Sequence, residues 1–382
     1  MNNKYQEEAL QFLTDVLSVP SVNGTAGEHA MALFLCDYLC SHGIAACLQP
    51  IDALHANVIG RIPGRSDQTV VWNGHLDTVP FGKMDEWDTN PSLPVRLENR
   101  IYARGASDMK SGLAAMAYVC AKMAENQVIP DDTILFAGTC DEEKGGLGAE
   151  SFLSIATEEQ PAFLLIGEPT GGRLGIAQKG CLWLSLTVNG KTSHGANPEE
   201  GGNALEGGFE VLQELKRNIN SYIHGILGIS TMQITMAEGG IAPNMTPDHA
   251  EFLADIRMVP ALTRDMVLHH LHQLCAEYTQ RLDGKVTFDV QLRNERMGIE
   301  IPKEDRWLRQ FEEILREQEL PVEYTGINYF TDASILLRQF PDCPVLLYGP
   351  GEPQLCHKPN EYVDVQKYLQ SLETYRRFYH RA

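Results

Sequence analysis

Residues 70–80 read VVWNGHLDTVP, an apolar run that ends at a histidine and an aspartate two positions apart. Valine and tryptophan in such a run are typical of a buried strand. Side chains two apart along a strand share one face, so the imidazole of His75 and the carboxylate of Asp77 are expected to meet. The stretch therefore predicts a strand of an internal sheet that ends in a polar site.

Two more apolar runs follow, at 133–139 and 162–166. Segments with helical apolar spacing, at 110–125 and 149–156, separate the three runs. Strands that alternate with helices in this way predict parallel pairing within an α/β sheet.

Polar residues come directly after each of the later runs. Asp141, Glu142 and Glu143 follow the second run, and Glu168 follows the third. Ligands of open α/β sheets bind outside the carboxyl ends of the strands. We therefore expect these acids and His75 to gather at one edge of the sheet.

The pattern changes at Cys181, where the order of expected elements becomes βαββαβ. This order is typical of a ferredoxin-like α+β unit with an antiparallel sheet. We expect a catalytic α/β domain at 1–179 and 296–382, with a mixed, largely parallel sheet flanked by helices. The ferredoxin-like unit at 180–295 would be inserted into it as a lid or dimerisation domain.

Composition excludes several classes of function. The chain has 382 residues, 31 Lys and Arg against 51 Asp and Glu, and a net charge of −20, which disfavours nucleic acid and anionic membranes as partners. The N-terminus lacks a basic and apolar leader, and no segment is long and apolar enough to span a bilayer. Nine cysteines without a C-x-x-C pair favour reduced thiols, so we expect a cytoplasmic protein.

Histidines and acids at or near the strand ends could hold a divalent metal, because imidazole and carboxylate suit zinc, cobalt or manganese. Asp77 could accept the second ring N–H of His75 and fix its tautomer. Each residue also has an ordinary interpretation: Asp108 could cap the helix that starts at Lys110, and the acid pair after 139 could be a solvated loop. The shared position at one edge favours a metal site, for which the candidates are His75, Asp108, Glu142, Glu143, Glu168 and His357.

Six motifs in order closely resemble the M20 family of dinuclear metallohydrolases, which includes acetylornithine deacetylase, succinyl-diaminopimelate desuccinylase, aminoacylase and glutamate carboxypeptidase. The resemblance covers nearly the whole chain. The motifs are GHLDTVP (74–80), YARGASDMKSGLAA (102–115), CDEEKGGLGA (140–149), IGEPT (166–170), GKTSHGANPEEGGNA (190–204) and HKPNEYV (357–363).

The resemblance implies two divalent metal ions, zinc or alternatively cobalt or manganese. It implies that Asp108 bridges both ions and that Glu142 is the general base. It also implies a cis peptide bond between Asp108 and Met109. The implied ligand sets are His75, Asp108 and Glu168 for one ion, and Asp108, Glu143 and His357 for the other.

Residues of the inserted unit complete the site in relatives. The resemblance implies that His194 donates to the oxyanion, in dimeric relatives from the partner subunit. It also implies that Asn244 and Arg257 bind the substrate carboxylate, for which a guanidinium is well suited. Near His357, the glycines Gly349 and Gly351 are expected to let the backbone approach substrate closely.

The expected reaction is hydrolysis of an amide that removes an N-acyl group from an amino acid, in a homodimer formed through the inserted domain. Glu168 favours a deacylase, because the peptidase branches of the family more often carry aspartate there. A carboxypeptidase or dipeptidase acting on a short peptide is the first alternative. A noncatalytic metal-binding homologue is the second, and the acyl group and the amine are not assigned.

Overall fold

The computed structural model describes residues 3–379 and divides the chain into two compact units. The first unit contains Met1–Ile176, Ile301–Thr325 and Thr331–Ala382, and the second contains Ala177–Glu300 and Gly326–Phe330. The sequence predicts domain boundaries at 179/180 and 295/296, and the main boundaries between the two compact units lie at 176/177 and 300/301. Within the described part of the chain, no helix is both long enough and apolar enough to cross a membrane.

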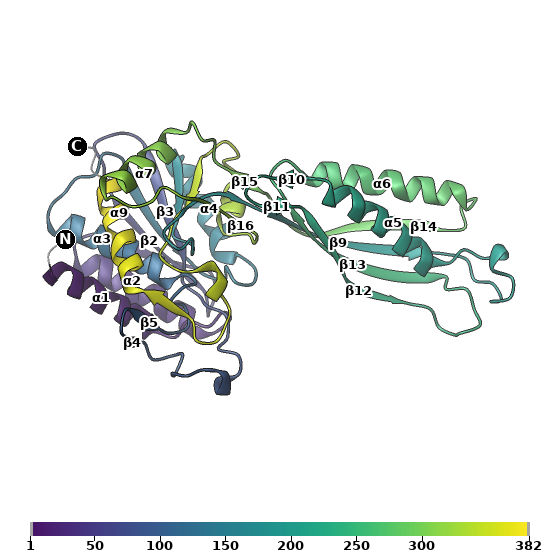
Figure 1. The fold of residues 1–382 in the computed structure, drawn as a ribbon, viewed down its shortest axis with the longest axis horizontal. Helices are drawn as coiled ribbons and strands as arrows, with labels where there is room; N and C mark the ends of the chain where they lie inside the picture. Colours follow the sequence, from purple (N-terminus) through teal and green to yellow (C-terminus); the bar gives the residue numbers. More distant parts are fainter. Residues whose placement is uncertain (1–2, 380–382) are drawn as a thin grey trace. The chain divides into compact units, whose positions relative to one another are not determined.

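Helices and strands alternate through the first unit (Figure 1). Up to the second unit, its elements are α1 (Asn3–Leu17), α2 (Ala26–Ser41), β1 (Ala45–Pro50), β2 (Ala56–Ile62), β3 (Thr69–His75), β4 (Val95–Leu97), β5 (Arg100–Tyr102), α3 (Lys110–Glu125), β6 (Thr133–Thr139), α4 (Leu147–Glu159), β7 (Phe163–Ile166) and β8 (Leu174–Gln178). After the second unit follow α7 (Arg306–Glu317), β16 (Tyr324–Ile327), α8 (Ala333–Leu336), β17 (Val345–Leu347), β18 (Tyr362–Asp364) and α9 (Val365–Phe378).

Across the first unit, the main sheet has the strand order β1-β2-β6-β3-β7-β17-β8, and β16 also pairs with β8. The four central strands, β6, β3, β7 and β17, are parallel, and β1, β2 and β8 pair antiparallel outside them. This mixed, largely parallel sheet confirms the predicted α/β class. Because the central strands are parallel, their carboxyl ends lie at one edge, as the acids after β6 and β7 require.

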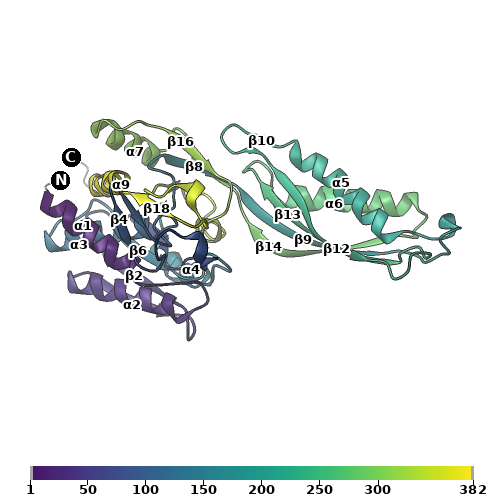
Figure 2. The same cartoon turned by 60° about the horizontal axis from the view of Figure 1, so that its bottom comes forward.

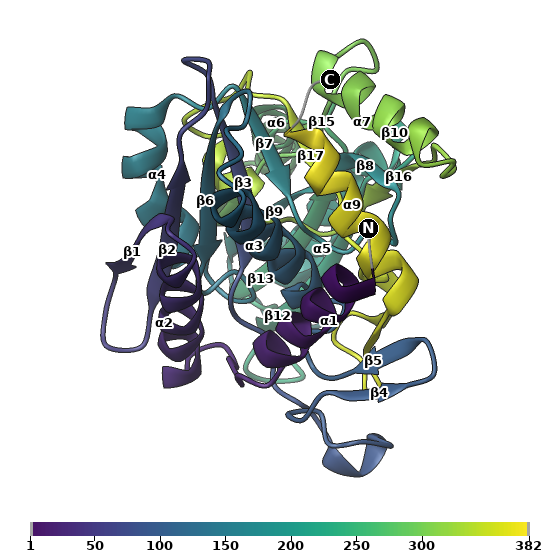
Figure 3. The ribbon, with the colours of Figure 1, turned by 90° about the vertical axis from the view of Figure 1, so that its left-hand side faces the viewer.

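Helices cover both faces of this sheet. The crossovers β3–α3–β6 and β6–α4–β7 run in opposite directions along the sheet, so right-handed connections put α3 and α4 on opposite faces. Figure 3 shows α1, α2 and α9 on the side of α3. With both faces covered, all seven residues of β3 are buried, which explains its continuous apolar run.

The second unit is a four-stranded antiparallel sheet of order β12-β13-β9-β14 with two helices. Figures 1 and 2 show α5 and α6 side by side along one face of the sheet. The order along the chain is βαββαβ, apart from a short hairpin, β10 (Ile223–His224) and β11 (Gly228–Ile229). The main elements are β9 (Gly180–Asn189), α5 (Ala204–Asn220), β12 (Thr231–Gly239), β13 (His249–Met258), α6 (Arg264–Arg281) and β14 (Thr287–Arg296), and β15 (Ile299–Glu300) then pairs with the end of β8.

Three of the features that were not predicted concern the sheets of the first unit. The antiparallel strands β1 and β2 lead into the sheet from α2, and β8 extends it after β7. The third is a small sheet of order β18-β5-β4, which joins residues near 100 to residues near 363. Each of its strands has three residues, too few for a periodic pattern to be read from sequence.

Candidate metal centre

Two groups of candidate ligands share one aspartate. His75, Asp108 and Glu168 form the first group, and Asp108, Glu143 and His357 form the second. Within each group, one donor atom from every residue lies within 4.8 Å of the others. The sets implied by the resemblance are therefore brought together in the described residues, from segments up to 282 positions apart along the chain (357 − 75).

The ends of three neighbouring strands deliver most of these residues. His75 is the last residue of β3, the loop after β6 carries Glu142 and Glu143, and Glu168 comes two residues after β7. Asp108 precedes α3, and its peptide bond to Met109 is cis, as the resemblance implied. His357, in the loop before β18, has a left-handed backbone with φ of 64°.

His75 is fixed by its own strand end. Its Nδ1 lies 2.9 Å from the main-chain oxygen of Asp77, and since a carbonyl only accepts, Nδ1 must carry a proton. Its Nε2 faces the acids, 3.2 Å from Asp108 Oδ1 and 3.9 Å from Glu168 Oε1. Nε2 is therefore the ring atom available to a metal.

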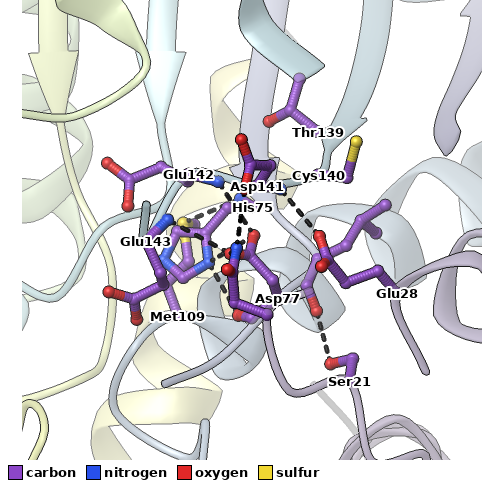
Figure 4. A network of polar contacts seen from close by, with 12 residues as sticks. Ser21, Glu28, His75, Asp77, Met109, Thr139, Cys140, Asp141, Glu142 and Glu143 are labelled. Atoms are coloured by element: carbon purple, nitrogen blue, oxygen red, sulfur yellow. Dashed lines mark hydrogen bonds and ion pairs between the residues drawn. The ribbon is translucent and has the colours of Figure 1, made fainter. Parts of the chain in front are cut away.

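The expected hydrogen bond from His75 to the Asp77 carboxylate is replaced by this carbonyl contact. The nearer carboxylate oxygen, Oδ1, is 3.7 Å from Nδ1, beyond hydrogen-bond distance. Instead, Oδ1 accepts from the amide of Glu142 and Oδ2 from that of Glu143, both at 3.2 Å (Figure 4). Asp77 therefore contacts the His75 ring through its backbone and holds the loop after β6 through its side chain.

The buried acids of the candidate site lie close together, and their pKa values are shifted. Burial raises the pKa of Glu142 and Glu168 well above the usual range, and neighbouring carboxylates add to this while His75 opposes it. Burial also disfavours ionised Asp108, but hydrogen bonds from His357 and His75 outweigh it and keep the pKa of Asp108 below its usual value. Hydrogen bonds to Asp108 and Glu143 raise the pKa of His357 to about 10. In the metal-free chain, protons on the imidazoles thus supply positive charge between the acids.

The residues present fit a pair of divalent cations. Imidazole nitrogen and carboxylate oxygen are suitable donors for zinc, cobalt and manganese. Glu143 Oε1 and Glu168 Oε2 are buried and have no hydrogen-bond partner among residues 3–379. Metal binding displaces protons from such ligands, so ions would take over the role of the imidazole protons and satisfy these oxygens.

A buried ion pair holds Asp108 in place. Arg104 Nη1 lies 2.7 Å from Glu361 Oε2, and the two side chains are 3% and 0% exposed. Glu361 Oε1 accepts from the amides of Ser107, at 2.7 Å, and Asp108, at 2.9 Å. Arg104 also donates to the carbonyl of Lys358, next to His357. One ion pair therefore links the backbone at two of the candidate ligands.

The two glycines after β17 are needed for backbone packing. A Cβ at Gly349 would lie 2.4 Å from the carbonyl oxygen of Gly167, and one at Gly351 would lie 2.0 Å from that of Ser107. The close approach is thus to the segments that carry Glu168 and Asp108. Backbone packing is therefore enough to explain these two glycines, and the expected close approach of substrate is not needed.

The remaining expected site residues lie in the second unit. His194 and Asn244 are exposed neighbours, because the amide of Gly195 donates to the carbonyl of Asn244 at 2.8 Å. His194 Nδ1 accepts from the amide of Ala196 at 3.1 Å, so the neutral ring carries its proton on Nε2. Arg257 donates through Nε and Nη2 to the carboxylate of Asp255, at 2.7 and 2.9 Å. The carboxylate of Asp255 therefore already balances the charge of Arg257.

Comparison with known proteins agrees with this geometry. A family profile described as "Peptidase family M20/M25/M40" matches residues 71–381. The chain belongs to the M20 peptidase family. It is a hydrolase that acts on amides, and its candidate ligands match the dinuclear metal binding of M20 enzymes.

Several relatives are deacylases by name. An acetylornithine deacetylase of Vibrio cholerae is 30% identical over 367 residues, covering 93% of each chain. A probable succinyl-diaminopimelate desuccinylase of Staphylococcus aureus is 22% identical over 404 residues, covering 97% of this chain and 96% of the other.

Solved M20 structures share the fold. The aminopeptidase PepT of Bacillus cereus has a TM-score of 0.79 at 19% identity and covers 98% of each chain. A dinuclear metal-binding M20 peptidase of Bacillus subtilis has a TM-score of 0.75 at 13% identity, covering 99% of this chain and 98% of the other.

The residues that support the candidate ligands were not predicted from the sequence. Arg104 and Glu361 each lie four residues from a ligand and inside a quoted motif, which was the available signal. Asn23 and Glu28 precede the first motif. Asn23 Nδ2 donates to Asp77 at 2.9 Å, and Glu28 accepts from the amide of Asp141 at 2.8 Å. Nothing in the local sequence indicated these contacts.

Replacing Glu361 should destabilise the first unit. Glu361→Gln leaves Arg104 buried without a counter-charge, which we expect to lower the free energy of unfolding by about 3–5 kcal/mol. Glu86→Gln is the control, because Glu86 pairs with Lys83 at the surface, where the side chains are 52% and 77% exposed, and should change it by less than about 1 kcal/mol. Denaturant unfolding of the metal-free proteins measures both. Equal effects would refute the role of the buried pair.

Proposed function

We propose that this M20 hydrolase removes an N-acyl group from an amino acid, using two divalent metal ions. The observation that carries the proposal is the pair of ligand groups that share Asp108, with Glu142 next to a ligand but outside both groups. The 30% identical acetylornithine deacetylase supports a deacylase. The ligands would be His75, Asp108 and Glu168 for one ion, and Asp108, Glu143 and His357 for the other.

Bound ions would lower the pKa of a water between them and polarise the amide carbonyl. The chain has to supply the movement of protons. Glu142 is suited to it, because burial raises the pKa of its carboxyl well above the usual range, so the group can both accept and release a proton. Its carboxylate takes the proton of the attacking water and later gives it to the leaving amine.

His194 is the proposed donor to the oxyanion. With Nδ1 occupied by the amide of Ala196, the neutral ring presents Nε2–H, and an oxyanion needs such a donor. The exposed position of His194 leaves that atom available. As in the dimeric relatives that the sequence resembles, we propose that the partner subunit supplies this histidine.

Recognition of the substrate carboxylate is assigned to Asn244 and Arg257. Asn244 is exposed beside His194 and offers an amide donor. Arg257 contacts Asp255 through Nε and Nη2, so the two N–H groups of Nη1 can donate to a substrate carboxylate. Because Asp255 balances the charge of Arg257, we expect Arg257 to orient the substrate carboxylate through hydrogen bonds more than to attract it by net charge.

This assignment requires a homodimer, which we propose forms through the second unit. β12 is one of the two edge strands of its sheet in the described part of the chain, and an edge strand presents unpaired backbone groups. Met236 on β12 is 66% exposed, and Ile241 just beyond this strand is 81% exposed.

The nine cysteines are free thiols, which fits the reducing cytoplasm that we propose as the compartment of this protein.

Peptide hydrolysis is the second candidate function. The fold neighbours include an aminopeptidase and a human carnosine dipeptidase, although identities of 19% and 14% support the fold alone. A noncatalytic metal-binding homologue is a third, which the complete ligand set and Glu142 disfavour.

Glu142 is tested by separating turnover from metal content. Glu142→Gln keeps the size of the side chain but cannot accept the proton, so kcat should fall by at least about 100-fold while two zinc ions per chain are retained. Asp108→Ala should lose zinc as well. The exposed Glu158→Gln on α4 is the control and should match wild type. Loss of zinc from Glu142→Gln would reassign Glu142 as a ligand.

The substrate class is tested with a panel of amides. The zinc-loaded enzyme is assayed with N-acetylornithine, N-succinyl-diaminopimelate, other N-acyl amino acids, dipeptides and tripeptides. We expect kcat/KM to be at least about tenfold higher for one N-acyl amino acid than for any peptide. The reverse order would make the enzyme a peptidase. Two bound zinc ions without hydrolysis of any amide would favour the noncatalytic homologue.

The dimer is tested by charging its proposed edge. Met236→Lys on β12 should shift the mass measured by light scattering from dimer towards monomer, because a buried unpaired charge is costly at an interface. Leu97→Lys on β4, at a position 50% exposed in the first unit, should stay dimeric. A monomeric wild type at micromolar concentration would end the proposal.

A further inference from the structure

Three successive backbone amides after β6 each donate to a buried carboxylate. The amide of Asp141 lies 2.8 Å from Glu28 Oε2, and those of Glu142 and Glu143 each lie 3.2 Å from an oxygen of Asp77 (Figure 4). Glu28 lies outside residues 71–381, which the M20 profile matches. A segment before the matched region therefore contacts the loop that carries the proposed base and one ligand.

Glu28 lies in the first turn of α2 and is fully buried. Thr25 caps the helix, so the pattern T-x-x-E predicts that Glu28 bonds back to the amide of the cap residue. Instead, its Oε1 accepts from the amide of Gly24 at 2.6 Å, and its Oε2 reaches Asp141. The carboxylate thus joins the start of α2 to the end of β6.

An imidazole supports Glu28 from its other side. His55 Nε2 lies 3.4 Å from Glu28 Oε1, an ion-pair contact without the geometry of a hydrogen bond. His55 Nδ1 lies 2.8 Å from both carboxylate oxygens of Asp52, within hydrogen-bond distance. Asp52, 49% exposed, also accepts from the amides of Leu54 and His55. The result is a carboxylate–imidazole–carboxylate chain from the surface to the loop after β6.

The ionised form of Glu28 needs this support. Burial, followed by the charge of Asp77, raises the pKa of Glu28 to about 7, while the amides of Gly24 and Asp141 and the His55 ring oppose the rise. A hydrogen bond to a carboxylate is about twice as strong as one between neutral groups. His55 therefore favours the form that holds Asp141 best.

The loop depends on contacts of this kind at Asp141. Its φ of 60° is left-handed, which is uncommon outside glycine, although aspartate tolerates it better than most residues. Asn23 Nδ2 donates to Asp141 Oδ1 at 3.1 Å and to Asp77 Oδ2 at 2.9 Å. Asp77 accepts from the amides of Glu142 and Glu143. Glu28 accepts from the amide before them, that of Asp141, and therefore fixes the position at which the turn after β6 begins.

We propose that Glu28, supported by His55, is a positioning residue that sets the placement of Glu142 and Glu143 through the amide of Asp141. This inference rests on the proposed function, since it assigns Glu143 to a metal and Glu142 to proton transfer. Glu28 touches neither of those side chains. Its effect is on the backbone from which they extend.

Paired variants test the proposal. Glu28→Gln and His55→Gln are compared with Glu125→Gln and His42→Gln, because His42 at the end of the same helix pairs with Glu125 at 3.3 Å and has no contact with the loop. In Glu28→Gln we expect one of the two Zn²⁺ equivalents to bind about 10–100-fold more weakly in competition with a chelator, and kcat to fall by a similar factor. KM should stay within about twofold, as expected for a residue that does not bind substrate. His55→Gln should act in the same direction by a smaller factor, and the control pair should match wild type.

A second measurement does not depend on metal or activity. Hydrogen exchange of the amides at 141–143 in the metal-free protein should be about tenfold faster or more in Glu28→Gln than in either control, because the loop opens more easily. Unchanged exchange and unchanged Zn²⁺ affinity in Glu28→Gln would overturn the inference, and if that variant does not fold, the same comparison with His55→Gln decides. A wild type that binds no zinc pair would refute the proposed function instead. The exchange rates would still report whether Glu28 holds the loop.

Discussion

Buried negative charge at the carboxyl ends of β3, β6 and β7 is the constraint on which the site depends. Parallel pairing brings the three strand ends to one edge, and Asp108 joins them from the start of α3. Taking several carboxylates out of water together is strongly unfavourable unless positive charge lies between them. Protons on His75 and His357 supply it in the metal-free chain, and divalent ions would supply more. Because the fold brings the candidate ligands together, ions bound there would also stabilise the first unit, and the free energy of unfolding should depend on metal concentration.

Around the candidate ligands lies a second set of acids that bind backbone and not metal. Glu361 accepts from the amides of Ser107 and Asp108. Asp77 accepts from the amides of Glu142 and Glu143 in the loop after β6, and Glu28 accepts from the amide of Asp141 in the same loop. In each case a carboxylate binds the main chain within two residues of a candidate ligand and leaves the side chain of that ligand free. Loops, which are otherwise the most mobile parts of a fold, can then hold ligands with the precision that a pair of ions requires.

The central sheet could be predicted from sequence because its strands leave a local signal, and the ligand sets followed from the motifs that resemble the M20 family. Continuous apolar runs identified the buried strands, and the polar residue after each run identified the edge. The supporting acids leave no such signal. Glu28 looks like a helix-capping residue. Asp77 looked like a partner of the His75 ring, because the sequence shows only that the two residues lie two positions apart on a strand. The side chain of Asp77 instead bonds amides 65 and 66 positions away. Long-range backbone contacts of this kind appear only when the strand order is known.

The histidines show how the backbone determines the chemistry available to a side chain. At His75, Nδ1 meets a carbonyl, which must accept, so the lone pair of the neutral ring is on Nε2 and can bind a metal. At His194, Nδ1 meets an amide, which must donate, so the neutral ring has its proton on Nε2 and can stabilise an oxyanion. The same residue type is therefore prepared for opposite roles by one hydrogen bond each. Sequence alone identifies the imidazoles as candidates, but the fold has to place a carbonyl or an amide beside Nδ1 before either role follows.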